Sequence, residues 1–495
     1  AMNKHLFKLL SPVLPITLLS NMASAQSIID AGKYGQTASF ATARSVGFGG
    51  ALGSVGGDFG SLSVNPAGLG IYRSSEFMIT PGLRFSSSDS KYTGGSTGDN
   101  NVRFGFNNIG AVFTEAASGK NYDKADWKSG SFAIGINRTA DFSRTYNYEG
   151  PNNTSSASQY FEGDAFKFPN STTDDPGTPA YLGYQSYLLG DYPYFTMVPY
   201  MSGINQRKTV QEKGGITELA ISGGGNYLDK LMIGGTLGIN FLNHRVNTSM
   251  YEETLNPAIS DSFDHFTYNE RFKTTGAGIN LKLGAIYKFN DYFRAGIAFH
   301  TPTVYSLTEI SSNNISVSSL AMGTNEARTP ENQYEYSYIS PFKAIASATG
   351  ILGKYGFISV DYEMVSYGTM RFNMDDKTTQ NRLNSIMKNT YGNASNIRAG
   401  LELRFDGFMI RGGYGFYGSP YKNETYQGTR NDYSFGLGYR FGQTFVDLGI
   451  INSRYTTREQ PYVLDQGADP TYVQPAFASV KNSLTTGILT IGWKL

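Results

Sequence analysis

Histidine is the side chain that most often moves protons in enzymes, so the few histidines of this chain are the first candidates for chemistry. The sequence has four. His5 lies in a leader-like segment, and no serine or aspartate forms a recognisable catalytic motif with His244, His265 or His300. The sequence therefore does not predict an enzyme.

Metal binding has no better support. The acidic pairs Asp174-Asp175 and Asp375-Asp376 lie in polar stretches without the further oxygen ligands that a calcium loop supplies at fixed spacing. The chain also contains no cysteine. We expect neither a metal nor a cofactor.

Arginines are the remaining candidates, because a guanidinium group binds carboxylates through a fork of donors. Two interpretations are open. These arginines hold the carboxylate headgroup of a ligand, or they pair with acids of neighbouring strands, and we favour the pairing. The arginines concerned are Arg398, Arg404, Arg411 and Arg440. The acids concerned are Asp361, Glu363 and Glu402.

These arginines occupy one face of segments that alternate every second residue. Apolar side chains fill the other face, as in 397–405 and 433–441. A period of two with charge on the second face is typical of a β-strand and excludes a helix.

Fourteen segments alternate in this way, and their connections are alternately long and short. Short turns on one side and long loops on the other are typical of a transmembrane barrel. An even count also lets an up-and-down barrel close. The strands are expected near 77–86, 102–114, 128–148, 208–227, 231–252, 265–288, 293–310, 333–352, 357–372, 394–405, 408–416, 430–441, 444–455 and 482–495. The long loops are expected near 87–101, 149–207, 253–264, 311–332, 373–393, 417–429 and 456–481.

Composition agrees with this all-β interpretation. The chain has 35 Tyr, 32 Phe and 58 Gly, and charged residues make up only 16%. Its 41 basic and 40 acidic residues give no reason to expect nucleic acid as a partner. Lys4 and Lys8, an apolar run over 9–19 and Ala23-Ser24-Ala25 predict a signal peptide over 1–25. We predict an outer-membrane protein of a Gram-negative bacterium, surrounded by outer-membrane lipids.

Residues 43–76 are too rich in glycine for a regular helix or strand. They include the turn Asn65-Pro66-Ala67-Gly68. Such a segment keeps one shape only when it is surrounded. We therefore expect three domains: the signal peptide 1–25, an N-terminal plug over 26–76, and a fourteen-stranded antiparallel barrel over 77–495 whose lumen the plug fills.

The connection over 149–207 is too long for a simple loop and should have structure of its own. Its second half is strongly apolar and aromatic. It forms either a small loop core or an exposed surface that captures apolar ligands. The candidate capture residues are Tyr181, Leu182, Tyr184, Leu188, Leu189, Tyr194 and Phe195.

The glycine-punctuated approach, the Asn65-Pro66-Ala67 turn and the strand about ten residues later resemble the hatch of FadL-type outer-membrane transporters. Asp361 to Gly368 and Phe299 to Thr303 give weaker matches. The resemblance covers the whole mature chain and implies transport of hydrophobic compounds such as long-chain fatty acids. In this family, extracellular apolar loops capture the substrate, an internal pocket holds it, and it leaves sideways past the hatch.

The resemblance also implies a kink in the third strand beside the Asn65-Pro66-Ala67 turn. Gly135 and Asn137 are the candidate kink residues. The internal pocket should be lined by apolar side chains with at most one or two polar groups.

A structural role is the main alternative. Some proteins of this wider family are subunits of outer-membrane secretion or assembly complexes, and they keep both hatch and barrel. Their partners would be other complex subunits, whereas those of a transporter are hydrophobic small molecules. An open porin is disfavoured by the plug.

Overall fold

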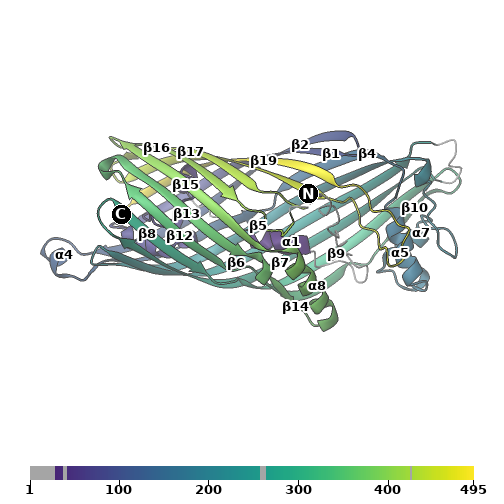
Figure 1. Cartoon of the computed structure of the whole chain (residues 1–495), viewed down its shortest axis with the longest axis horizontal. Helices are drawn as coiled ribbons and strands as arrows, with labels where there is room; N and C mark the ends of the chain where they lie inside the picture. The colour runs from purple at the N-terminus through teal and green to yellow at the C-terminus, as the bar shows by residue number, and fades with distance from the viewer. Residues whose placement is uncertain (1–27, 37–41, 257–262, 424–425) are drawn as a thin grey trace, which may run out of the picture.

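The computed structural model describes residues 28–36, 42–256, 263–423 and 426–495. The expected signal peptide lies outside these ranges. One antiparallel sheet closes into a barrel, because the first strand, β1 (Glu76–Tyr92), pairs with the last, β19 (Ala478–Lys494) (Figure 1). The wall has fourteen strands, as predicted.

Ten wall strands are continuous, four consist of two segments each, and β10 only extends a hairpin with β9. The other continuous strands are β2 (Gly95–Ala116), β5 (Ile204–Tyr227), β6 (Leu231–Thr254), β7 (His265–Lys288), β15 (Asn393–Phe405), β16 (Phe408–Tyr417), β17 (Arg430–Phe441) and β18 (Thr444–Glu459). The divided strands are β3 (Trp127–Asp141) with β4 (Arg144–Asn152), β8 (Phe293–His300) with β9 (Val304–Ser319), β11 (Asn332–Ile339) with β12 (Lys343–Ile351), and β13 (Gly356–Ser366) with β14 (Arg371–Asn373). The hairpin extension is β10 (Gly323–Arg328).

Side chains alternate along these strands as predicted. In β17, Tyr433, Phe435 and Tyr439 are exposed, whereas Gly436 and Gly438 between them are buried. Exposed aromatic and aliphatic residues recur on the outward face of nearly every strand. A continuous apolar outer band is what a barrel needs to lie in lipid.

Two loops predicted from the sequence are wrong. Residues 87–101 belong to β1 and β2, which pair in register as far as Tyr92 and Gly95 around a tight turn. Residues 311–332 likewise form most of β9 and β10. Both stretches are rich in Ser, Asn, Thr and Gly and have few apolar residues, so their alternation is weak in the sequence even though the hydrogen-bonded ladder continues.

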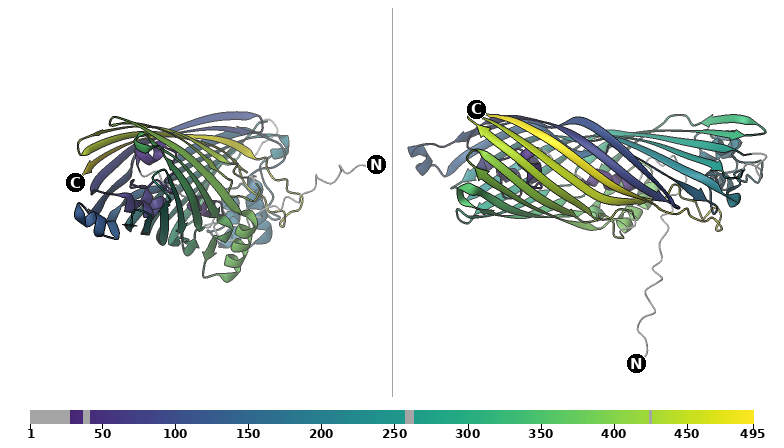
Figure 2. Two further views of the ribbon diagram at one scale, coloured as in Figure 1. Left: turned by 60° about the vertical axis from the view of Figure 1, so that its left-hand side comes forward. Right: turned by 90° about the horizontal axis from the view of Figure 1, so that it is seen from above.

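The helices lie inside the barrel or at its ends, as Figures 1 and 2 show. Inside are α1 (Ile28–Gly35), α2 (Ala43–Gly47), α3 (Ser61–Val64) and the 3-10 helix η1 (Pro66–Ile71). In the connections are α4 (Lys120–Lys124), α5 (Ser158–Lys167), α6 (Ser171–Asp174), α7 (Pro179–Gln185), η2 (Tyr200–Ser202), η3 (Gly353–Tyr355), η4 (Tyr367–Thr369) and α8 (Lys377–Thr390). Across the described ranges, none of these helices has the length and apolarity to span a lipid bilayer.

Residues 42–72 pack tightly against the inner wall. Gly47 lies against the backbone of Gly436, where an added Cβ would come within 2.9 Å of its Cα. A Cβ on Gly413 would come within 2.4 Å of the Gly49 nitrogen. Such close backbone contact is possible only between glycines. Arg44 extends from this segment to Glu402 of the wall, with its Nε 2.9 Å from a carboxylate oxygen.

Candidate functional site

A cavity with a volume of about 490 Å³ lies between α1 and the wall. Its lining comes from α1, from β1 to β6, from β17 and the connection before it, and from the closing strands β18 and β19. The sequence predicted a pocket lined by apolar side chains with one or two polar groups. That prediction is wrong for this cavity, because ionisable side chains line much of it. Eight are basic: Lys33, Arg84, Arg103, Arg138, Arg144, Lys208, Arg430 and Arg458. Four are acidic: Asp30, Asp141, Glu212 and Glu459.

The basic groups outnumber the acids that contact them. Three guanidinium groups surround the single carboxylate of Asp141, at 3.2 Å for Arg84, 3.5 Å for Arg103 and 3.7 Å for Arg138. Glu212 is shared between Lys33, at 2.7 Å, and Arg144, at 3.0 Å. The remaining positive charge makes the cavity favourable for an anionic group.

Sequence reasoning missed this arginine cluster around Asp141, because its members come from three strands. Arg84 is on β1, Arg103 on β2 and Arg138 on β3. Only Arg103 gives a partial signal of facing inward, because it lies between the outward-facing residues Val102 and Phe104. Only the pairing of the strands brings the three together.

The wall is interrupted beside this cluster. The ladder between β2 and β3 runs only from the Asn108–Asn137 pair to the Ala116–Ser129 pair, and β4 pairs with β5 alone. Further out, Asp99 accepts hydrogen bonds of 2.7 Å from both the backbone and the side-chain nitrogen of Asn147. Between the end of the β2–β3 ladder and the contact of Asp99 with Asn147, residues 103–107 and 138–144 line the cavity. Phe104 and Phe106 in this stretch are also exposed, so the lining of the cavity continues to the outer face of the wall at this interruption.

The candidate kink residues lie just before this interruption. Gly135 and Asn137 pair regularly with both neighbouring strands. The register shifts between Arg138 and Ala140, and β3 ends at Asp141. Opposite the shift, β5 contains Gly214 and Gly215 with φ of +110° and +157°.

The Asn65-Pro66-Ala67 turn contacts another part of the wall. The Asn65 amide donates to the Gly53 carbonyl at 2.6 Å and to carbonyls of Ala285 on β7 and Ile297 on β8, both at 3.3 Å. The expected position of this turn at the third strand is therefore wrong. Other residues of the plug contact that strand: Ser63 accepts a hydrogen bond from Asn137 at 2.9 Å.

The four arginines predicted as headgroup contacts lie elsewhere, and three of them pair with wall acids. Arg398 lies 3.6 Å from Asp361 and 3.4 Å from Glu363. Arg404 and Arg411 both contact Glu402 at 2.7 Å, and Arg411 is fully buried. Arg440 is exposed and lies 5.8 Å from the ring centre of Phe445. None of the four lines the cavity.

Some of the candidate capture residues form a loop core, and others are exposed, so each of the two interpretations of this loop applies to part of it. Leu182, Leu188 and Leu189 are buried in a loop core that also contains Phe161 and Phe266. In contrast, Phe195 is 51% exposed. Tyr181, Tyr184 and Tyr194 are half-buried.

Helix α5 of this loop is hydrogen-bonded to the connection between β18 and β19. Glu162 accepts a hydrogen bond from the Tyr472 hydroxyl at 2.7 Å and one from the Thr196 nitrogen at 2.9 Å. Burial raises the pKa of Glu162 above its ordinary value, since these two hydrogen bonds offset only part of the desolvation. Burial also raises the pKa of Asp164, which lies on the same helix.

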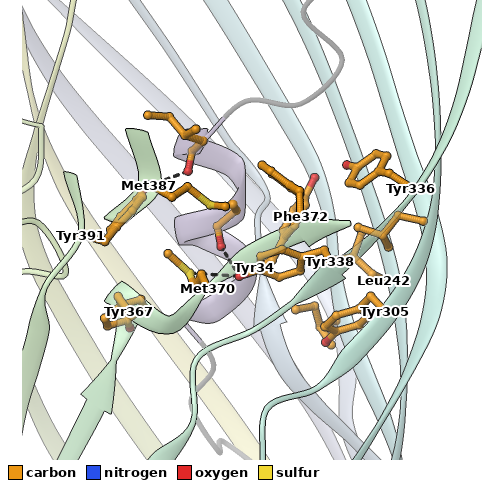
Figure 3. Close-up of a cluster of buried hydrophobic side chains, with 14 of the residues drawn as sticks. Tyr34, Leu242, Tyr305, Tyr336, Tyr338, Tyr367, Met370, Phe372, Met387 and Tyr391 are labelled. Atoms are coloured by element: carbon orange, nitrogen blue, oxygen red, sulfur yellow. Dashed lines mark hydrogen bonds between the residues drawn. The ribbon is translucent and has the colours of Figure 1, made fainter. Parts of the chain in front are cut away.

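A second, apolar site lies on the other side of α1. Ile28, Ala31 and Tyr34 of the helix are buried against a cluster that we call the tyrosine cluster (Figure 3). The cluster comprises Tyr305, Tyr336, Tyr338, Tyr367, Met370, Phe372, Met387 and Tyr391. Tyr338 and Tyr391 donate hydrogen bonds to the α1 carbonyls of Ala31, at 2.7 Å, and Ile28, at 2.8 Å.

The three histidines have separate partners. His244 is bonded to the Tyr34 hydroxyl at 3.1 Å, His265 contacts Asp264 at 2.9 Å, and His300 is bonded to the Val64 carbonyl at 2.8 Å. His244 and His265 lie opposite Thr274 and Glu253, respectively, and are therefore far apart along the β6–β7 pair.

No known protein-family profile and no curated protein matches the sequence. Solved structures do match. A FadL homologue from Pseudomonas aeruginosa is 12% identical with a TM-score of 0.55, over 93% of this chain and 99% of that one. The toluene transporter TodX of P. putida is 12% identical with a TM-score of 0.51, over 92% and 98%. The toluene transporter TbuX of Ralstonia pickettii is 14% identical with a TM-score of 0.50, also over 92% and 98%.

At these identities the comparison concerns the fold. The chain has the fold of the FadL-type barrels, as the resemblance in its sequence predicted. The first and last strands pair, so neither is left as a free edge of the sheet, and the outer band is apolar. These are the properties of an outer-membrane barrel of a Gram-negative bacterium.

Proposed function

We propose that this barrel transports hydrophobic compounds with an acidic end, such as long-chain fatty acids, across the outer membrane. The ligand is captured on the extracellular apolar loops, passes into the cavity beside α1, and leaves sideways through a side opening between β2 and β3. The two structures described as toluene transporters and the FadL homologue support transport of an apolar molecule. The acidic end is our addition from the charge of the cavity.

The observation that carries this proposal is the position of the arginine cluster beside the interruption between β2 and β3. An acyl chain gains about 0.8 kcal/mol per CH₂ on leaving water, so it needs an apolar route, which the exposed Phe104 and Phe106 continue into the bilayer. Its carboxylate needs donors at the same place, and Arg84 and Arg103 provide them. Release past the plug then needs no water-filled channel.

Uptake of labelled dodecanoate by cells with and without the gene tests the proposal. We expect the deletion to lose most of the uptake, and restoration of the gene to recover it. Normal uptake in the deletion would contradict transport.

A structural role in an outer-membrane complex is the second candidate. The observation in its favour is the extracellular surface formed by Tyr187, Tyr192, Phe195 and Met201, which are between 51% and 79% exposed. Exposed apolar patches of this kind bind partners as well as ligands. Recovery of a complex in fixed stoichiometry from solubilised membranes, together with normal uptake in the deletion, would support this role.

A further inference from the structure

The tyrosine cluster inside the barrel is covered by a helix of the protein itself. The charged cavity lies on one side of α1, where Ile29, Asp30 and Lys33 line it. The tyrosine cluster lies on the other side, where Ile28, Ala31 and Tyr34 are each at most 2% exposed. A ligand that enters the cavity therefore meets α1 before it meets the cluster.

We propose that the tyrosine cluster is the apolar binding site of the transported molecule, and that α1 occupies it as an internal competitor which the ligand must displace. This inference rests on the proposed function. Figure 3 shows the helix against the aromatic rings that the ligand would contact in its place.

Displacement of α1 is inexpensive because the helix has little stability of its own. It has eight residues, including Gly32 and Gly35, whereas an isolated helix needs about 12–15 residues to persist in water. Each glycine within a helix costs a further ~0.5–1 kcal/mol relative to alanine. Gly32 cannot be larger in the docked helix, since an added Cβ would lie 2.3 Å from the Tyr391 hydroxyl oxygen. Contact with the cluster therefore holds α1 in place.

The hydrogen bonds of α1 indicate the chemistry of its competitor. When the helix leaves, the buried hydroxyls of Tyr338 and Tyr391 lose their carbonyl acceptors. Tyr338 then keeps only the weakly accepting Met370 sulfur at 3.1 Å, and Tyr391 keeps the Tyr421 hydroxyl at 3.3 Å. Because a poorly satisfied buried donor costs free energy, a ligand with an acceptor oxygen binds better than one without. The class favoured is an alkyl or aryl compound that carries a carboxyl or carbonyl oxygen.

Displacement of α1 would also change the packing beside the proposed side opening between β2 and β3. The Tyr34 ring lies 5.7 Å from the ring of Phe142, the residue that follows the end of β3. Both rings also contact His244, which lies on β6. Departure of α1 removes Tyr34 from this group, so occupation of the tyrosine cluster loosens the packing beside the interruption in the wall.

A tether on α1 tests the inference, and the absence of native cysteine makes it practical. Lys33 and Glu212 form an ion pair of 2.7 Å, so cysteines at both positions lie within reach of a short bis-methanethiosulfonate. The double variant Lys33→Cys/Glu212→Cys would be reconstituted in lipid nanodiscs. Saturable binding of tritiated dodecanoate would then be measured before cross-linking, after cross-linking and after reduction.

We expect the cross-link to weaken binding at least tenfold and reduction to restore it. The matched control is Lys288→Cys/Asp291→Cys, which replaces an ion pair of 2.8 Å in a short turn outside the cavity and should bind equally in all states. Equal affinity with and without the α1 tether would overturn the inference and leave transport standing. Absence of saturable binding in every form, wild type included, would overturn both.

Gly32→Ala gives an independent readout without a change in charge. The added methyl group opposes docking of α1, so this variant should bind dodecanoate several-fold more tightly than the wild type. Dodecylammonium, which has no acceptor oxygen, should compete at least tenfold less well than unlabelled dodecanoate. Weaker binding by Gly32→Ala, or equal competition by the amine, would contradict the inference.

Discussion

The side chains around Asp141 give the cavity its preference for an anionic group. One carboxylate is shared by three arginines, so two positive charges remain for a ligand. The other acids of the lining are similarly shared or lie beside a cation. Local charge excess, and not the near-zero net charge of the whole chain, is the quantity that a ligand in the cavity would experience.

Arg103→Gln should therefore reduce dodecanoate uptake about three- to tenfold, because a hydrogen bond to a charged group contributes ~1.5–3 kcal/mol and partial exposure lowers this value. Arg73→Gln is the matched control, since Arg73 also pairs with one aspartate, Asp229, but lies outside the cavity. Equal loss in both variants, measured at equal surface expression, would argue against a ligand contact at Arg103.

At the scale of elements, the plug and the wall fit through glycines that face each other. Gly412 and Gly413 are neighbours on β16 with opposite orientations. A Cβ on Gly413 would meet the Gly49 backbone, whereas nothing lies within 4 Å of a Cβ on Gly412. The plug is thus in backbone contact with the wall, and one methyl group is enough to disturb it.

Gly413→Ala should leave the barrel folded and increase its ion conductance in a planar bilayer, because overpacking of about 1–3 kcal/mol displaces the plug. Gly412→Ala should behave as the wild type. Unchanged conductance in Gly413→Ala would show that the plug adapts without opening a path.

The extracellular helices should respond to pH through Glu162. Its pKa is raised in the folded protein, so the folded state binds this proton more tightly than the unfolded state does. The contribution of Glu162 to stability is therefore complete below the ordinary carboxyl pKa and is lost as pH rises through the folded pKa. Asp164 adds to the same trend.

Protection factors from hydrogen exchange of α5 and α7 amides should accordingly fall as the pH rises above the ordinary carboxyl pKa. They should fall less in Glu162→Gln, which keeps an acceptor oxygen for Thr196 and removes the charge. An equally steep decline in the variant would assign the pH dependence to other groups.

The sequence predicted elements better than it predicted the site, for physical reasons. Alternation along β17 and the polar face of β15 depends on local residues, and both are as expected. The cavity depends on which strands meet, so Arg84, Arg103 and Arg138 could not be connected in advance. Residues 87–101 lie beyond the apolar band, where paired strands need no alternation. The pairing of Arg398, Arg404 and Arg411 with wall acids is the favoured interpretation, and the partners of Arg398 and Arg411 do lie on neighbouring strands. Arg404 instead pairs with Glu402 of its own strand.

At the scale of the whole molecule, the closed sheet, the apolar outer band and the filled lumen belong together. Closure pairs the first strand with the last in lipid, and we expect the segment inside the barrel to prevent leakage through the lumen. We expect the protein to fractionate with the outer membrane and to migrate faster on a gel when unheated than when boiled. Recovery in a soluble fraction, or a circular dichroism spectrum dominated by helix, would be incompatible with this fold.

The unequal strands give the barrel a high side and a low side. β5, β6 and β7 each have 24 residues, whereas β16 has 10 and β17 has 12. At about 3.3 Å per residue and a tilt of about 40°, this corresponds to a height of roughly 60 Å against roughly 25–30 Å. The high side therefore projects further from the bilayer than the low side. We expect an antibody or a phage on an intact cell to bind at the high side first.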